Sequence, residues 1–166
     1  MRAPSRVFLP FAGLLVLADC ASKRAVEGAI PPGVPKPIIS DVLRFTLAYN
    51  PGAAFSTHFG PYQRWVLIAL VLSVLFVLAR SYHRIAQTGR FASAGLALIV
   101  GGAVGNLLDR LLSDRGVVDF IDIGIGAHRF FVFNVADAGV SVGVALLGFA
   151  LWQHQRATPA LRATGE

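Results

Sequence analysis

The sequence predicts a membrane α-helical protein with four transmembrane helices, a small extracytoplasmic antiparallel β-sheet and loops. Three observations support this fold class. Of the 166 residues, 55% are hydrophobic and only 14% are charged, and the mean hydropathy is +0.63. Soluble domains of this size are rarely so apolar. The apolar residues also fall into blocks, and the segments between the blocks are polar or alternate in polarity. We expect residues 1–166 to form a single domain.

Four apolar blocks are predicted to span the membrane, because each is close to the roughly 20 residues that a bilayer-spanning helix needs. The second reaches this length only if it begins near Tyr62. The blocks are residues 7–26, 62–79, 91–108 and 132–152. The basic segment RSYHRIAQTGR, residues 80–90, is expected to be a short turn between the second and third spans. The longer segments 27–61 and 109–131 must then lie together on the opposite side of the membrane.

The charges orient this topology. Lysine and arginine alone do not decide between the two orientations, because they are divided almost evenly between the two sides. All acidic residues except Glu166, however, belong to the side opposite the termini, and part of the basic charge there lies in a long segment where the positive-inside rule is weak. We therefore expect both termini in the cytoplasm.

The segments between spans predict a small sheet. Residues 117–123 alternate in polarity and are followed, after glycines, by residues 128–133, a pattern typical of a hairpin. Alternation places Asp119 on one face and Asp122 on the other. Residues 41–50 also resemble a strand, which ends at NPGAAFS, residues 50–56. Pro51 and Gly52 favour a tight turn there, and the small Ala53 and Ala54 would let another group approach the backbone.

Several functions are disfavoured by composition. The net charge of +6 comes partly from basic residues that flank spans, so anionic lipid is the expected partner and nucleic acid is not. A lone cysteine and four scattered histidines indicate no metal site, and no cofactor is expected. The N-terminus resembles a lipoprotein signal peptide ending at Cys20, but Asp19 stands where a small uncharged residue should precede the cysteine. We expect Cys20 to be neither lipidated nor catalytic.

Polar side chains within the apolar blocks are the candidate functional residues, because ionisable groups in a membrane are costly and usually mark function. Asp137 lies about six residues inside the fourth predicted span, and Asn134 shares its helical face. Asn106 and Arg110 share a face of the third span, where nearby glycines permit close packing. Taken alone, Asn106 and Arg110 fit a hydrogen-bond network between helices as well as they fit a functional site.

Five sequence blocks in order give the chain a resemblance to the signal peptidase II family of bacterial inner-membrane aspartic endopeptidases. The blocks cover nearly the whole chain, and the first is the least typical of the family, because Cys20 follows Asp19. They are DCASK (residues 19–23), NPGAAFS (50–56), GGAVGNLLDR (101–110), VVDF (117–120) and FNVADA (133–138).

The resemblance implies the roles of individual residues. Asp119 and Asp137 would be the catalytic pair, and Asp19 and Lys23 would belong to a structural motif. Substrate binding and polar support would come from Asn50, Gly52, Asn106, Arg110 and Asn134. Family members cut prolipoproteins just before a cysteine that carries diacylglycerol, at the extracytoplasmic face, and are sensitive to the cyclic peptide globomycin.

Elementary chemistry agrees with this resemblance. Two carboxylates that share one proton can hydrolyse a peptide bond, because the ionised one draws a proton from water while the protonated one polarises the carbonyl. Asp114, in a polar turn, and Asp122, on the other strand face, should be dispensable for this chemistry, whereas loss of Asp109 should disturb helix packing. Two alternatives stay open: an ion relay in a proton-coupled carrier or channel, and an assembly subunit whose polar residues only join helices.

Overall fold

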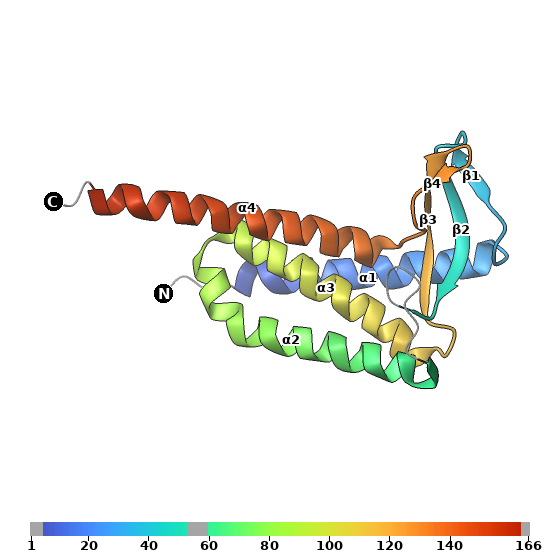
Figure 1. The fold of residues 1–166 in the computed structure, drawn as a ribbon, viewed down its shortest axis with the longest axis horizontal. Helices are drawn as coiled ribbons and strands as arrows, with labels where there is room; N and C mark the ends of the chain where they lie inside the picture. Colours follow the sequence, from blue (N-terminus) through green and yellow to red (C-terminus); the bar gives the residue numbers. More distant parts are fainter. Residues whose placement is uncertain (1–4, 53–59, 164–166) are drawn as a thin grey trace.

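The computed structural model describes residues 5–52 and 60–163, with side chains described for residues 7–52 and 60–156. Four helices lie side by side along the long axis, and a small sheet stands at one end of the bundle (Figure 1). The helices are α1 (Ser5–Ala29), α2 (Gln63–Gln87), α3 (Arg90–Leu112) and α4 (Val135–Ala163), with a 3-10 turn, η2 (Gly60–Tyr62), before α2. The strands are β1 (Lys36–Ile39), β2 (Leu43–Asn50), β3 (Val117–Ile125) and β4 (His128–Arg129).

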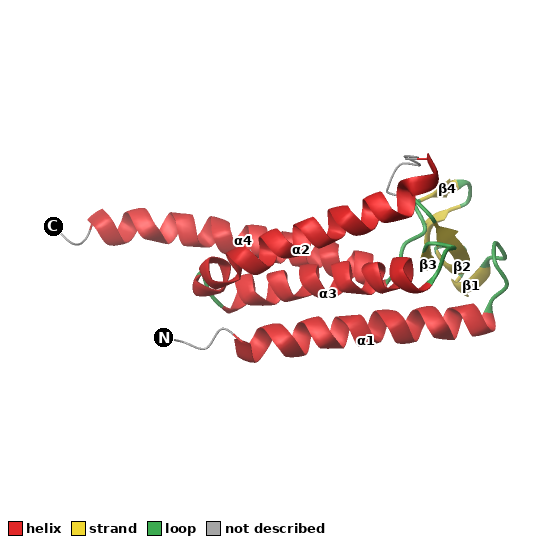
Figure 2. Ribbon diagram, turned by 90° about the horizontal axis from the view of Figure 1, so that it is seen from below, coloured by secondary structure: helices red, strands yellow, loops and turns green. Residues whose placement is uncertain are grey.

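Helix α3 is the centre of the bundle and contacts α1, α2 and α4. Figure 2 shows the four helices from below, with the sheet beyond the end of α3 and beside the last turns of α1. Glycines on α3 permit these close contacts. A Cβ atom on Gly102 would lie 2.4 Å from the carbonyl oxygen of Ala136 in α4, and one on Gly101 would lie 2.8 Å from that of Ala12 in α1. Small residues at such positions let helix backbones touch in a membrane.

Gly102→Ala should therefore destabilise the bundle. The added methyl group meets backbone of α4, which cannot rotate away, and overpacking of this kind costs about 1–3 kcal/mol. Gly148→Ala is the matched control, because nothing lies within 4 Å of a Cβ atom there and alanine favours the helix. We expect a lower melting temperature in detergent for Gly102→Ala only. Equal melting of Gly102→Ala and the unmodified protein would contradict this packing.

Three helices of the described part are long and apolar enough to cross a membrane: residues 60–87, 90–112 and 135–156. They correspond to the predicted second, third and fourth spans, with shifted ends. The predicted first span, residues 7–26, lies within α1 and is helical, but α1 is not among the three. Asp19, Lys23 and Arg24 lower its apolar character. A fourth span thus stays a prediction.

The predicted turn over residues 80–90 is wrong in most of its length. Helix α2 continues to Gln87, and only Thr88 and Gly89 separate it from α3. The segment is polar at the membrane surface, but its arginines, alanine and glutamine are good helix formers, so the helix continues beyond the apolar block. Gly89 makes the reversal possible, because its φ of +140° is rarely adopted by other residues.

The sheet is antiparallel throughout, in the order β1-β2-β3-β4. The strand predicted over residues 41–50 and the first strand of the predicted hairpin correspond to β2 and β3. The second strand, predicted over 128–133, is shorter: β4 has two residues, and beyond it only Phe133 forms an isolated bridge, to Ile121. Sequence reasoning missed β1, which is exposed along its length and contains Pro37, so no alternation marks it. The predicted turn at Ala53 and Ala54 lies outside the described residues.

One face of the sheet packs on the end of α1. Val26 of α1 and Ile30, just after α1, form a buried cluster with Leu47, Val118 and Phe120 of the two central strands. Because successive side chains of a strand alternate between faces, Asp119 belongs to the opposite face from Val118 and Phe120. The core of the sheet therefore determines which way Asp119 points.

The prediction that Asp122 is dispensable for the chemistry would fit a carboxylate free at the surface. In the structure it is buried and hydrogen-bonded. It is 5% exposed and accepts hydrogen bonds from Arg44 Nε at 3.2 Å, Thr46 Oγ1 at 2.9 Å and Arg129 Nε at 2.8 Å. Burial alone would raise its pKa, but the hydrogen bonds from Arg129 and Thr46 and the charges of Arg129 and Arg44 outweigh burial and lower the pKa. Asp122 thus joins β2, β3 and β4.

Asp122→Asn should lower the melting temperature of the protein at neutral pH. The pKa of Asp122 is lower in the fold than its ordinary value of 3.8, so its stabilisation is complete above that value and is lost as pH falls through the folded pKa. The difference in melting temperature between the variant and the unmodified protein should accordingly shrink below about pH 4. A difference that is absent at neutral pH, or unchanged in acid, would contradict this role.

Candidate active site

Asp119 and Asp137 are brought together by Asn134. The Nδ2 group of Asn134 donates to Asp119 Oδ1 at 2.7 Å, and its backbone N–H donates to Asp137 Oδ2 at 3.2 Å. Asp119 belongs to β3, whereas Asp137 lies in the first turn of α4. The prediction that Asp137 lies six residues inside a span is wrong, because α4 begins at Val135. Asn134 is completely buried between the two carboxyl groups.

Asn134 and Asp137 also start helix α4. The backbone N–H of Asp137 donates to Asn134 Oδ1 at 2.9 Å, while Asp137 accepts from the backbone N–H of Asn134. Reciprocal bonds between residues three apart are the capping-box arrangement, which satisfies N–H groups at a helix start. Two polar residues near the start of an apolar segment therefore have a structural reason as well as a place in the site.

Asn106 joins α3 to this pair. Its Nδ2 group donates to Asp137 Oδ1 at 2.7 Å, and its Oδ1 accepts from Asn134 Nδ2 and from Lys23 Nζ, both at 3.0 Å. The alternative prediction of a hydrogen-bond network between helices is thus correct as a description of its contacts. The same contacts place the Asn106 amide directly on a candidate catalytic carboxylate.

Asn50 supports the other carboxyl group. Its Nδ2 group donates to Asp119 Oδ2 at 3.1 Å, and its Oδ1 accepts from the backbone N–H of Gly52 at 3.1 Å. This turn holds the end of β2 against the start of β3. A Cβ atom on Gly116 would lie 2.3 Å from the carbonyl oxygen of Asn50, and Gly116 has a φ of +97°, so only glycine fits there.

Arg110 completes the predicted set. It donates from Nη1 to the carbonyl oxygen of Asn106 at 3.1 Å and from Nη2 to that of Gly52 at 3.3 Å. Its charge also interacts with Asp119 and Asp137. The Nε atom of Arg110 is buried and has no hydrogen-bond partner among the described residues.

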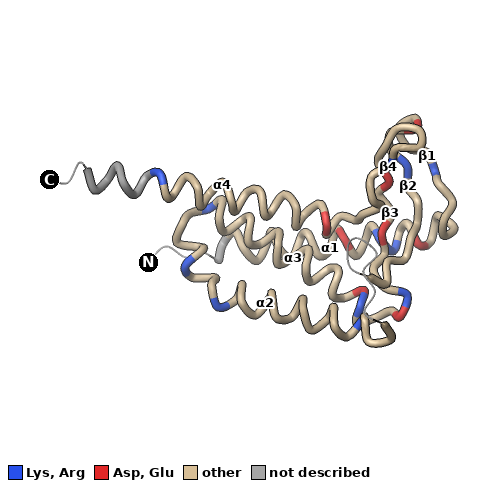
Figure 3. The backbone as a smooth tube through the Cα atoms, in the orientation of Figure 1, with Lys and Arg blue, Asp and Glu red and all other residues tan. Residues whose placement is uncertain are grey.

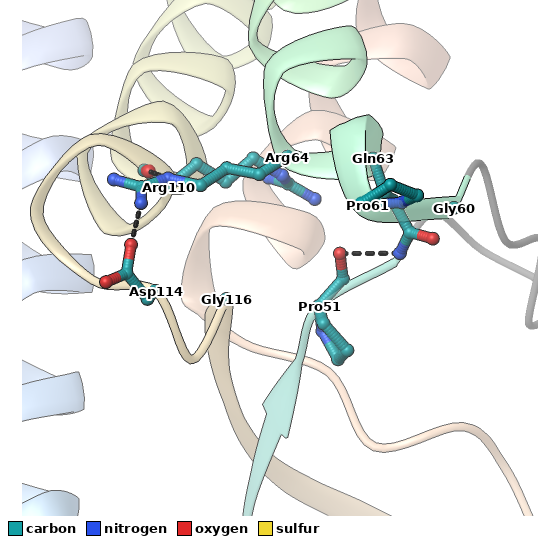
Figure 4. A pocket seen from close by; sticks show the side chains of 8 residues that line it. All are labelled: Pro51, Gly60, Pro61, Gln63, Arg64, Arg110, Asp114 and Gly116. Carbon is teal, nitrogen blue, oxygen red and sulfur yellow. Dashed lines mark hydrogen bonds and ion pairs between the residues drawn. The ribbon is translucent and has the colours of Figure 1, made fainter.

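A cavity of about 240 Å³ lies against Pro51 and Arg110, between the start of α2 and the end of α3 (Figure 4). Arg64 and Arg110 are neighbours in its wall, because Arg64 Nε donates to the carbonyl oxygen of Arg110 at 2.6 Å, and Arg64 also pairs with Asp114. Across the cavity, Gln63 Nε2 donates to the carbonyl oxygen of Pro51 at 2.7 Å. Neither Asp119 nor Asp137 lines this space, but Pro51 and Arg110 extend the site toward it.

Asp19 and Lys23, predicted as a structural motif, are buried against the same network. Asp19 Oδ1 accepts from the backbone N–H of Ala136 at 2.9 Å, in the first turn of α4. Lys23 Nζ lies 2.7 Å from Asp19 Oδ2 and 2.8 Å from Asp109 Oδ2, and that oxygen of Asp109 also accepts from the N–H of Val118 at 3.1 Å. Sequence reasoning expected a packing role for Asp109 but had no signal for its pairing with Lys23, because the two residues are far apart in the chain.

The surroundings of Asp119 favour its protonated form. Burial is the main cause that raises the pKa of Asp119 to about 6; the charge of Asp137 adds to the rise, and the hydrogen bonds from Asn50 and Asn134 and the charge of Lys23 oppose it. Asp137 accepts N–H groups from the side chain of Asn106 and the backbone of Asn134, in the first turn of α4. The pair can therefore hold a proton near and below the raised pKa of Asp119.

Asp119, Asp137, Asn50, Gly52, Asn106, Arg110 and Asn134 all belong to this one contact network. In the described part of the chain, no three His, Cys, Asp or Glu side chains are grouped as metal ligands. Cys20 is a free thiol in α1. The contacts do not test whether it is lipidated, so that expectation stays a prediction.

Known proteins are similar to this chain in sequence and in fold. The lipoprotein signal peptidase of Geobacter metallireducens is 33% identical over 158 residues, which cover 94% of this chain and 96% of the relative. That of Hydrogenovibrio crunogenus is 36% identical over 136 residues, 81% of this chain and 78% of the relative. A solved bacterial membrane enzyme superposes with a TM-score of 0.80 at 28% identity, over 90% of both chains.

The family comparison covers the whole site and most of the bundle. Residues 11–153 match the family model of signal peptidase (SPase) II. This range includes every residue of the network described above. The resemblance found in the five sequence blocks is confirmed, and the chain belongs to the signal peptidase II family.

Proposed function

We propose that this protein is an aspartic endopeptidase of the bacterial inner membrane that removes signal peptides from prolipoproteins by cutting before a diacylglyceryl-modified cysteine. The observation that carries the proposal is the pair Asp119 and Asp137, held at one buried asparagine in a member of a peptidase family. Relatives named lipoprotein signal peptidase support the substrate class. Membrane lipid surrounding the apolar helices is the other expected partner.

The surroundings of the two carboxyl groups support different roles for them. Asp137, which accepts N–H groups on both oxygens, is the base that takes a proton from the attacking water. Asp119, with its pKa raised to about 6, is the acid that donates a hydrogen bond to the scissile carbonyl. As the tetrahedral intermediate collapses, the proton held by Asp137 passes to the leaving amine and the C–N bond breaks.

Arg110 and Asn50 are proposed to support the substrate. The Nε atom of Arg110, which has no partner in residues 5–52 and 60–163, is a donor that could meet a substrate carbonyl oxygen, since guanidinium groups only donate. Asn50 keeps Asp119 aligned, and the carbonyl of Gly52 keeps Arg110 extended. The cavity lined by Pro51 and Arg110 gives polypeptide room to lie next to Arg110.

A cleavage assay tests the proposal. Purified protein incubated with a diacylglyceryl-modified prolipoprotein should release the signal peptide, and the same prolipoprotein without the lipid should remain intact. Globomycin should inhibit the reaction. An ion relay or an assembly subunit would give no shortened product under any of these conditions, and that result would overturn the peptidase proposal.

We further propose a topology with four spans, α1 included, and both termini in the cytoplasm. Helix α1 begins, and helix α4 ends, at the end of the bundle opposite the sheet (Figure 1). Basic residues in the last turns of α2 and at the start of α3 lie at that same end, whereas the acidic residues gather near the sheet (Figure 3). Leu9, Leu14 and Leu17 of α1 are exposed, as lipid-facing side chains would be.

The topology predicts the behaviour of reporters. An alkaline phosphatase fusion after Glu166 should be inactive, because the reporter folds only outside the cytoplasm, and a fusion in the β1–β2 connection at Asp41 should be active. The second fusion is the positive control for expression. Phosphatase activity after Glu166 would overturn the proposed orientation and would place the acid pair on the cytoplasmic side.

A further inference from the structure

The ammonium group of Lys23 is buried in the same network as the acid pair. Its hydrogen bonds and ion pairs among the described residues go to Asp19, Asp109 and Asn106 and not to Asp119 or Asp137. Its residue is 2% exposed, and Nζ lies within 3.0 Å of three acceptors on α1 and α3. The acceptors are Asp19 Oδ2 at 2.7 Å, Asp109 Oδ2 at 2.8 Å and Asn106 Oδ1 at 3.0 Å. An ammonium group has three N–H donors, and the oxygen of Asn106 accepts the one that the two carboxylates leave over.

The third contact helps to determine the orientation of the Asn106 amide, together with the bond from Asn134 Nδ2 to the same oxygen. An ammonium group can only donate hydrogen bonds, so the Asn106 atom that faces Lys23 must be the oxygen. The NH2 group must then face Asp137, to which it donates at 2.7 Å. A flipped amide would place an oxygen against the Asp137 carboxylate, which is repulsive while Asp137 is ionised.

We propose that Lys23 is a positioning residue for the acid pair: it fixes the Asn106 amide with its NH2 group toward Asp137 and supplies a buried positive charge that keeps one carboxyl group of the pair ionised. This inference rests on the proposed function, because it assigns Lys23 a part in the same reaction. It goes beyond a structural motif, because a purely structural lysine would affect folding but not the ionisation of the pair.

The charges around the pair decide the direction of the expected effect. Removing Lys23 leaves the buried Asp19 and Asp109 without their shared cation, so the negative potential at the pair increases. A more negative potential makes the carboxyl groups of the pair harder to ionise. Arg110 is present in the variant and in the unmodified protein alike, so it does not offset the loss of Lys23. The charged or titratable groups that face the pair are Asp19 and Lys23 from α1, Asp109 and Arg110 from α3, and Asp119 and Asp137 themselves from β3 and α4.

The test compares Lys23→Met with Arg24→Met. Arg24 is the next residue of α1, is exposed and carries the same charge, so its loss controls for a general change of net charge. With a diacylglyceryl-modified prolipoprotein, Lys23→Met should lower kcat at least about tenfold with KM nearly unchanged, and should move both limbs of the kcat/KM profile to higher pH by about one unit. Arg24→Met should keep the profile of the unmodified protein.

A second variant covers the case in which Lys23→Met does not fold. Lys23→Met combined with Asp19→Asn removes the buried ion pair as a unit, and the asparagine oxygen can still accept from Ala136. This double variant still lacks the Lys23 donor to Asn106, although the bond from Asn134 Nδ2 remains, so kcat should stay at least about tenfold low even where the melting temperature recovers relative to Lys23→Met. A near-normal kcat in the double variant, or loss of activity in Lys23→Met with an unshifted pH profile, would overturn the inference. If the unmodified protein itself fails to cleave, the proposed function has failed instead.

Discussion

Asp119→Asn and Asp137→Asn are each expected to lower cleavage of the prolipoprotein by about 10³-fold or more while the protein stays folded. An amide matches a carboxyl group in size, but it can neither accept a proton from water nor share one. Each replacement keeps one oxygen to accept from the surrounding asparagines. Turnover and melting temperature should be measured on the same purified samples. If the two carboxyl groups act chemically, turnover should fall while the melting temperature stays nearly the same.

Asp114→Asn is the matched control for these variants. The Asp114 side chain is 92% exposed, pairs with Arg64 and contacts neither catalytic candidate, so cleavage should be nearly normal. Asp109→Asn should fall between the two, because its carboxylate holds Lys23 and the N–H of Val118. If activity tracked melting temperature across the whole series, the carboxylates would only be joining helices, and a rapid Asp137→Asn enzyme would refute the acid pair.

The pH dependence of the unmodified protein follows from the same pair. The acid must keep its proton, and the pKa of Asp119 is raised to about 6, so kcat/KM should decline as pH rises through the raised value. Activity should also decline in acid, where the base becomes protonated. The two limbs belong to the pair as a whole. Asp114→Asn should leave both limbs in place.

Asn134→Asp is expected to have the second-largest effect, with cleavage reduced by about 10²-fold or more at neutral pH. The change replaces an NH2 group, which donates to Asp119, Asn106 and the carbonyl of Val118, with a carboxylate. A third buried negative charge next to Asp119 and Asp137 would make it harder for either to ionise. The Asn134 oxygen that caps α4 is retained, because aspartate is an equally good N-cap residue.

The retained cap makes this variant informative. Asn134→Ser is the comparison: serine also caps a helix, adds no charge and is too short to reach Asp119 as asparagine does. We expect Asn134→Ser to lose less activity at neutral pH than Asn134→Asp, although it removes more of the side chain. The opposite order would mean that packing around Asn134 matters more than its charge and donors.

Local sequence determined the features that depend only on whether a segment faces lipid, water or the protein core. Apolar blocks of the length of a bilayer predicted the three helices that could cross it, and period-two alternation predicted β3 and the face on which Asp119 lies. The five short blocks identified the family, and the comparisons confirm it. These features are set within a few residues of chain, so they can be read without knowledge of what lies opposite.

Tertiary structure decided the features that depend on partners distant in the chain. The ends of α2 and α4 were misplaced because helix formers continue past an apolar block, and because Asn134 and Asp137 cap α4 at a point that hydropathy does not mark. The ion pairs of Lys23 and of Asp122 join residues that become neighbours only when the chain folds. A buried polar group must find a partner, but which partner it finds depends on the packing of the whole bundle and sheet.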